Sequence, residues 1–137
     1  MVVSFLSIDQ ENHKIAYQSE ATVYHNTYTF LDKSLKDTSI ELTKTTDFVT
    51  LRRFGYCTMD MQFCLNKITH GVYNNKDGLE FSFSIRTTEL KIENSRIRIA
   101  YTMSIEGDEV SQQRIQFSFF KSKTWILTKT LDNFVNL

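Results

Sequence analysis

The sequence predicts an all-β protein, a single antiparallel up-and-down β-barrel spanning residues 1–137. Apolar and polar residues alternate with a period of two, as expected of strands that bury one face. Short turn sequences separate the alternating segments, and their lengths keep the apolar residues of neighbouring strands on one face. The composition agrees, because 11 Phe, 6 Tyr and no Pro suit pleated strands, and closing a barrel protects edges that proline would otherwise block.

The alternation is clearest in four segments, Tyr56–Leu65, Leu79–Arg86, Arg96–Ile105 and Ser111–Phe119. In each, the apolar residues take the odd-numbered positions, which predicts one inward and one outward face. Around Thr87–Glu89 the apolar phase changes from odd to even, which predicts a β-bulge or a sharp bend. The predicted inward residues are Cys57, Met59, Met61, Phe63, Leu65, Leu79, Phe81, Phe83, Ile85, Ile97, Ile99, Tyr101, Met103, Ile105, Ile115, Phe117 and Phe119.

Three turns predict the pairing of strands. We expect two-residue loops at His25-Asn26 and Asn94-Ser95, and a three-residue loop at Arg53-Phe54-Gly55 with Gly in the left-handed conformation. The predicted opposite residues are Val23 with Tyr28, Ala21 with Phe30, Ile92 with Ile97, Leu90 with Ile99, Leu51 with Cys57, and Val49 with Met59. Further turns are predicted at Lys33–Asp37, Lys44–Asp47, Asn74–Gly78 and Glu106–Asp108, giving about nine to eleven strands.

The end of the chain carries a different pattern. Leu127, Leu131, Phe134 and Val135 follow a helical spacing, so this segment is either a short C-terminal helix or a last strand with a frayed tail.

The balance of charge excludes several classes of partner. Lysine and arginine number 16, and aspartate and glutamate also number 16, so the chain lacks the basic footprint of a nucleic-acid-binding protein. No segment approaches the ~20 apolar residues of a membrane helix, and the N-terminal residues lack the pattern of a signal peptide. We expect a cytoplasmic protein without membrane insertion. The basic pair Arg52-Arg53 beside Phe54 and Tyr56 could contact single-stranded nucleic acid, but a solvated turn is the plainer reading.

The two cysteines, Cys57 and Cys64, fall on opposite faces of one predicted strand. Seven residues of strand span about 23 Å, whereas a disulfide needs Cα atoms within roughly 7 Å. We therefore expect two free thiols, which suits a reducing cytosol. With His70 and Asp60 they supply the residue types of a thiol hydrolase. Cys57, however, stands in the apolar register, where a free cysteine acts as a small hydrophobe.

No other constellation indicates chemistry. The three histidines are scattered singly, without the spacing of metal ligands on one strand face. The sequence therefore predicts no metal site, no catalytic residue and no cofactor, and an enzyme ranks as the third interpretation of function.

Several short segments resemble, in their order and spacing, a known family. They are Arg53-Phe54-Gly55, Met61-Gln62-Phe63, Tyr73 followed by Gly78, and Ile85-Arg86-Thr87. The stretch from about Ala21 to Phe119 is similar to the DUF1934 family of small bacterial proteins, also called YwiB-like. Where that family typically has Thr-Pro before the glycine, this chain has Asn74–Asp77, and Ser122–Leu137 lies outside the similar region.

The resemblance implies a calycin-like β-barrel, the architecture of lipocalins and fatty-acid-binding proteins, in a bacterial cytosolic protein of a low-GC lineage. It implies no activity and supplies no catalytic residues. By analogy of fold, the leading hypothesis is non-enzymatic binding of a small apolar or amphipathic molecule, such as a fatty acid, inside the barrel. Arg53, at the end of a strand, would meet an anionic head group. The predicted lining residues are Arg53, Met59, Met61, Phe63, Tyr73, Phe81, Phe83, Tyr101 and Phe117.

The alternative is a protein-interaction module with a filled barrel core and an unidentified protein partner. A cavity that contains a buried charge would favour the ligand hypothesis, whereas a filled interior with an exposed apolar patch would favour the partner.

Overall fold

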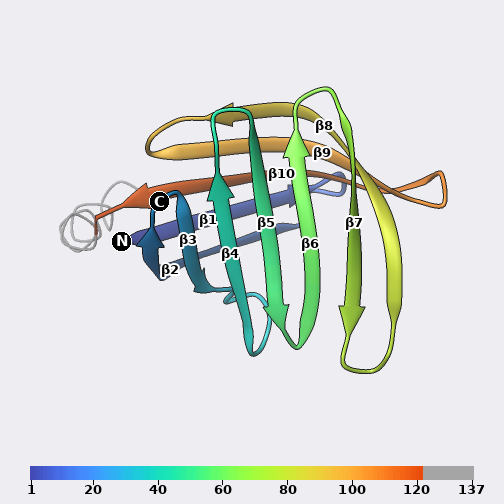
Figure 1. Ribbon diagram of the computed structural model, residues 1–137, viewed down its shortest axis with the longest axis horizontal. Coiled ribbons are helices and arrows are strands. Elements are labelled where there is room, and N and C mark those ends of the chain that lie inside the picture. The colour runs from blue at the N-terminus through green and yellow to red at the C-terminus, as the bar shows by residue number, and fades with distance from the viewer. Residues whose placement is uncertain (122–137) are drawn as a thin grey trace.

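The computed structural model describes residues 1–121, and these form ten antiparallel strands that close into a barrel (Figure 1). The strands are β1 (Val2–Asp9), β2 (Lys14–Tyr24), β3 (Thr27–Leu31), β4 (Thr38–Lys44), β5 (Phe48–Gly55), β6 (Cys57–Cys64), β7 (Ile68–Asn75), β8 (Glu80–Ile92), β9 (Arg96–Ile105) and β10 (Asp108–Phe120). Each strand pairs with the next along the chain, and β1 pairs with β10 to close the barrel. The predicted all-β up-and-down barrel is confirmed; the alternative of a C-terminal helix concerns residues outside the described part.

The barrel is flattened into two layers. In Figure 1, β4 to β7 run across the front with the first part of β8 beside β7, and the later part of β8, β9, β10, β1 and β2 pass behind them in a different direction. Because every connection is a hairpin, the turns alternate between two ends of the barrel. The turns that follow β1, β3, β5, β7 and β9 share one end, which we call the pocket end. The opposite end, which we call the terminal end, holds the remaining turns, Met1 and Lys121.

Apolar side chains fill most of the interior. The largest side chains that are almost fully inaccessible to solvent are Phe63, Phe117, Ile40, Leu42, Leu51, Ile85, Ile97 and Ile99, and they belong to one continuous core. Burial of this apolar area stabilises the barrel by roughly 25 cal/mol for each Å² removed from water. Most inward residues expected from the alternation in β6, β8, β9 and β10 lie in this core or pack against it, and Cys57 is also buried. The prediction is wrong for Leu65 and Leu79, which are 43% and 54% exposed because they lie just beyond the end of β6 and just before the start of β8.

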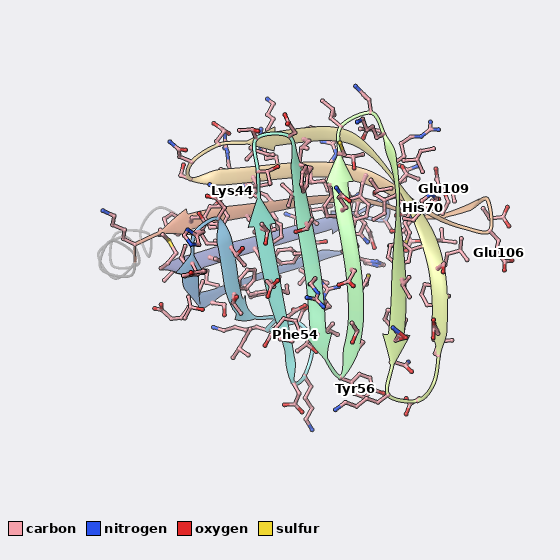
Figure 2. All side chains as sticks on the ribbon, viewed as in Figure 1. Lys44, Phe54, Tyr56, His70, Glu106 and Glu109 are labelled. Carbon is pink, nitrogen blue, oxygen red and sulfur yellow. The ribbon has the colours of Figure 1, made fainter. Side chains whose placement is uncertain are left out.

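Lys44 covers the core at the terminal end. Its Nζ lies 5.6 Å from the ring centroid of Tyr28 and 5.3 Å from that of Phe119. The same ammonium group donates hydrogen bonds of 3.2 Å to the carbonyl oxygens of Glu93 and Asn94, and Figure 2 labels it beside β4. The two hydrogen bonds therefore tie the end of β4 to the turn between β8 and β9, and the cation–π contacts hold it against β3 and β10.

Two of the three predicted turns give the expected pairing. The confirmed pairs are Val23 with Tyr28, Ala21 with Phe30, Leu90 with Ile99, and Ile92 with Ile97. The predicted bulge is also present, because the register between β8 and β9 shifts between Thr87 and Glu89.

The predicted turn at Arg53-Phe54-Gly55 is wrong. Leu51 lies opposite Met61 rather than Cys57, so the partner is displaced by four positions along β6. The reason lies in the neighbouring strand: β5 continues as far as Gly55, which pairs with Thr38 of β4. The chain reverses only after Gly55.

This correction places Arg53 inside the barrel. Because the displacement is an even number of residues, the inward face of each strand is unchanged. Arg53 is the third inward residue of β5 after Val49 and Leu51, and it lies opposite Met59, while Val49 lies opposite Phe63. Its side chain is only 16% exposed.

Both cysteines lie on β6 as free thiols, with Cys57 buried and Cys64 partly accessible. We expect a thiol reagent to modify native Cys64 at least about tenfold faster than native Cys57, because only Cys64 is reachable without opening the barrel. Labelling rates of the single-thiol variants Cys57→Ser and Cys64→Ser measure this, and both thiols should react equally fast in denaturant. Faster labelling of Cys57 in the native protein would contradict its inward orientation.

Candidate functional site

A pocket of about 200 Å³ opens into the barrel at the pocket end. Its walls come from both layers and from the loop between β3 and β4. The lining residues are Phe5, Ser7, Ile15, Ser34, Leu51, Arg53, Met59, Met61, Tyr101, Met103, Gln113 and Ile115. Three methionines and several aliphatic side chains thus surround a small number of polar groups, which is the usual character of a small-molecule site.

An ion pair is buried beside this pocket. The Nε of Arg53 donates a hydrogen bond of 2.9 Å to Oδ2 of Asp32, whose side chain is inaccessible to solvent. The other carboxylate oxygen, Oδ1, accepts hydrogen bonds from the backbone N–H of Ser34, at 2.9 Å, and from the Ser34 hydroxyl. Asp32 therefore has partners for both oxygens, as a buried carboxylate requires.

The hydroxyl of Tyr17 has no comparable partner. It is one of two buried side-chain polar atoms within residues 1–121 that lack a hydrogen bond, the other being Oγ1 of Thr87. Burial raises the pKa of Tyr17, the charge of Asp32 and a weak hydrogen-bonding interaction with its carboxylate raise that pKa further, and Arg53 lowers it. The Tyr17 hydroxyl thus lies close enough to the ion pair to feel its charges, and it stays protonated at neutral pH.

A second tyrosine and a glutamine complete the polar part of the pocket. Burial raises the pKa of Tyr101 to about 12, and the Arg53 guanidinium acts in the opposite direction. Gln113 accepts a hydrogen bond of 3.0 Å from the Ser7 hydroxyl and donates one of 3.1 Å to Ser111. The Tyr101 hydroxyl therefore stays protonated near neutral pH, and the Gln113 amide does not titrate.

The inward polar residues gather at one end because of the strand topology. Arg53 follows Val49 and Leu51 on the inward face of β5, and Asp32 follows Tyr28 and Phe30 in the same alternation from β3. Both β3 and β5 run toward the pocket end. A polar residue that ends an apolar alternation on either strand therefore reaches the same mouth of the barrel.

The structure brings together four of the nine predicted lining residues: Arg53, Met59, Met61 and Tyr101 line the pocket. Phe63, Phe83 and Phe117 are instead part of the solid core. Tyr73 and Phe81 stack on each other with ring centroids 4.9 Å apart at the side of that core.

Four residues at the site were not predicted from the sequence: Tyr17, Asp32, Ser34 and Gln113. Alternation carried a usable signal for two of them, because Asp32 continues the inward register of Tyr28 and Phe30, and Gln113 precedes Ile115 and Phe117 in theirs. Ser34 lies in a loop, and loops have no such periodicity.

The other constellations do not assemble. Arg52 points outward, where it pairs at 3.0 Å with Asp60, so Arg52 and Arg53 serve opposite faces of β5. Cys57 faces the core, whereas Cys64 and Asp60 lie on the outward register of β6, and His70 is exposed on β7 (Figure 2). Within residues 1–121, no three His, Cys, Asp or Glu side chains come together in a way that could hold a metal ion. The same residues contain no helix of the length and apolarity needed to cross a membrane.

The fold and the pocket define the kind of protein: a small, closed, ten-stranded antiparallel barrel with a largely apolar pocket, which contains a few polar groups, at the end opposite Met1 and Lys121. The chain belongs to the family described as "Domain of unknown function (DUF1934)", whose model matches residues 3–117. The match begins earlier than the predicted Ala21, so β1 and β2 belong to the family's domain.

One solved structure is similar in fold. The crystal structure of the ywiB protein from Bacillus subtilis superposes with a TM-score of 0.59 at 14% sequence identity, covering 88% of this chain and 89% of that one. At this identity the likeness concerns the fold. The comparison with curated proteins gave no match.

Proposed function

We propose that this protein binds a small amphipathic molecule in the pocket at the pocket end. The observation that carries the proposal is the buried Arg53–Asp32 pair beside the pocket, with a Tyr17 hydroxyl next to it that makes no hydrogen bond of good geometry. A buried ion pair contributes little net stability, because desolvating both charges offsets their attraction. Polar groups that are costly to bury and only partly satisfied are typical of binding sites.

The size of the pocket limits the ligand. Pockets for drug-sized molecules are typically about 300–1,000 Å³, whereas this one is about 200 Å³. The core beyond it is occupied by Phe63, Phe117 and their neighbours. A long-chain fatty acid would need these side chains to move apart, so a short amphiphile fits better than the fatty acid that fold analogy suggests.

Binding is tested by native mass spectrometry of protein purified from its own host, followed by ligand-observed NMR with a library of small amphiphiles. We expect a retained adduct, or saturable binding in the micromolar to millimolar range, corresponding to about 4–8 kcal/mol. Met59→Trp should abolish it, because the larger ring fills the pocket. Thr58→Trp, on the outward face of the same strand, is the matched control. If no compound binds, or if Met59→Trp and the control behave alike, the pocket is not a ligand site.

A protein partner is the second candidate, and exposed apolar residues around the pocket end favour it. Leu35, Phe54, Tyr56 and Leu79 are between 39% and 54% exposed, and Figure 2 shows Phe54 and Tyr56 on the lower turns. Tyr56 is held there by a hydrogen bond of 2.8 Å from its hydroxyl to Asp77. This hypothesis predicts that Phe54→Ser removes a copurifying protein and leaves small-molecule binding unchanged.

A further inference from the structure

We propose that the ligand of this pocket carries a carboxylate, which accepts hydrogen bonds from the two terminal nitrogens of Arg53 and from the Tyr17 hydroxyl. The inference rests on the proposed function and names the chemical class of the ligand. It follows from the polar atoms around the pocket that remain without partners, among which N–H and O–H donors dominate.

The acceptors of the buried ion pair are already engaged. Oδ2 of Asp32 accepts from Arg53, and Oδ1 accepts from both the backbone and the hydroxyl of Ser34. Oε1 of Gln113 accepts from Ser7. A ligand ammonium group would therefore have to displace an existing donor, and it would lie beside the positive charge of Arg53.

The donors are not all engaged. Arg53 uses only Nε toward Asp32, and within residues 1–121 no hydrogen bond involves its two terminal nitrogens. These nitrogens form the end edge of the guanidinium, which matches the two oxygens of a carboxylate. The Tyr17 hydroxyl, which interacts only weakly with the Asp32 carboxylate and makes no hydrogen bond of good geometry, supplies a third donor beside the same group.

Asp32 then acts as the residue that positions the guanidinium. It engages Nε of Arg53, which leaves the two terminal nitrogens of this pocket-lining residue for the ligand. Asp32 neutralises the charge of Arg53. The preference of the pocket for a carboxylate over an uncharged ligand therefore depends on the paired hydrogen bonds more than on long-range attraction. The apolar part of the ligand would contact Met59, Met61 and Met103, whose flexible side chains adapt to different shapes. A short aliphatic chain or a single ring suits this volume.

The test compares three compounds of one shape: 3-phenylpropionate, 3-phenylpropanamide and 3-phenylpropanol. We expect wild-type protein to bind the carboxylate at least tenfold more tightly than the amide or the alcohol, measured by ligand-observed NMR or calorimetry. Tyr17→Phe removes an unsatisfied hydroxyl without removing charge, so it should stay folded and weaken the carboxylate about three- to tenfold. The double variant Asp32→Asn/Arg53→Met leaves no unpaired charge, and it should bind the carboxylate no better than the amide.

The outcomes separate the two proposals. Equal affinity of wild-type protein for all three compounds, or unchanged discrimination in the double variant, would overturn the carboxylate and leave ligand binding standing. If none of the three binds and the wider library also fails against wild-type protein, the proposed function itself is wrong. A circular dichroism spectrum of each variant excludes loss of fold as the cause.

Discussion

Replacing Arg53 by methionine is expected to lower the free energy of unfolding by about 3–5 kcal/mol, because the Asp32 carboxylate would stay buried without a counter-ion. The Asp32 side chain is fully inaccessible to solvent, and its remaining hydrogen-bond partner, Ser34, carries no charge. Methionine keeps most of the side-chain volume, so the loss measures the charge and not a cavity. Urea unfolding followed by circular dichroism gives the value, with an unchanged m-value as the sign that the same transition is observed.

Two further variants make this result specific. Arg52→Met removes the neighbouring arginine, whose ion pair with Asp60 is 57% exposed on both sides, and it should cost less than about 1 kcal/mol. The double variant Asp32→Asn/Arg53→Met should recover much of the stability lost in Arg53→Met, since no uncompensated charge remains. Equal effects of Arg52→Met and Arg53→Met would show that the ion pair at Arg53 is not buried in solution.

Gly55→Ala is expected to destabilise the barrel by more than about 2 kcal/mol, because two costs coincide at this position. Gly55 has a φ of +130°, a conformation that residues with a side chain rarely adopt. A Cβ atom there would overlap the carbonyl oxygen of Asp37 and approach the Cα of Thr38 to 3.0 Å. Both obstacles are backbone atoms, one in the residue before β4 and one in the first residue of β4, so no side-chain rotation relieves the contact.

Gly107 provides the matched control. It also has a positive φ, of +86°, but no atom lies within 4 Å of the position a Cβ would take. Gly107→Ala should therefore show the conformational cost alone, about 1 kcal/mol. If chemical denaturation gives the same loss at both positions, the pairing of Gly55 with Thr38 is incorrect.

The inward and outward faces of the strands were predictable from local pattern. The side-chain direction along a strand has a period of two, so a run such as Ile97, Ile99 and Tyr101 reveals its buried face without knowledge of any partner. Where a turn has only two residues, as at His25-Asn26 and Asn94-Ser95, the same logic also gave the correct pairs. The turn after β5 escaped prediction because the preceding hairpin partner, β4, extends that strand to Gly55.

The candidate site was predicted only in part, because the sequence does not show which residues of different strands meet. Arg53 was identified as a site residue, yet it was placed in a turn, and its partner Asp32 is 21 positions away along the chain. Alternation shows that a residue faces the interior, but it carries no information on which inward residue of another strand lies at the same depth. That depth depends on the register of each intervening pair and on closure through β1 and β10.

The sequence by itself determined the class of fold, the inward face of most strands and the separation of the two cysteines, because these depend on the strand period and on short turns. Only the tertiary structure decided that Arg53, Asp32 and Tyr17 meet at one mouth of the barrel, and that aromatic side chains fill the rest of the interior. The physical reason is that strand alternation and hairpin turns act over a few residues. Contacts between inward residues of different strands require the closed barrel, whose register is the sum of all ten pairings.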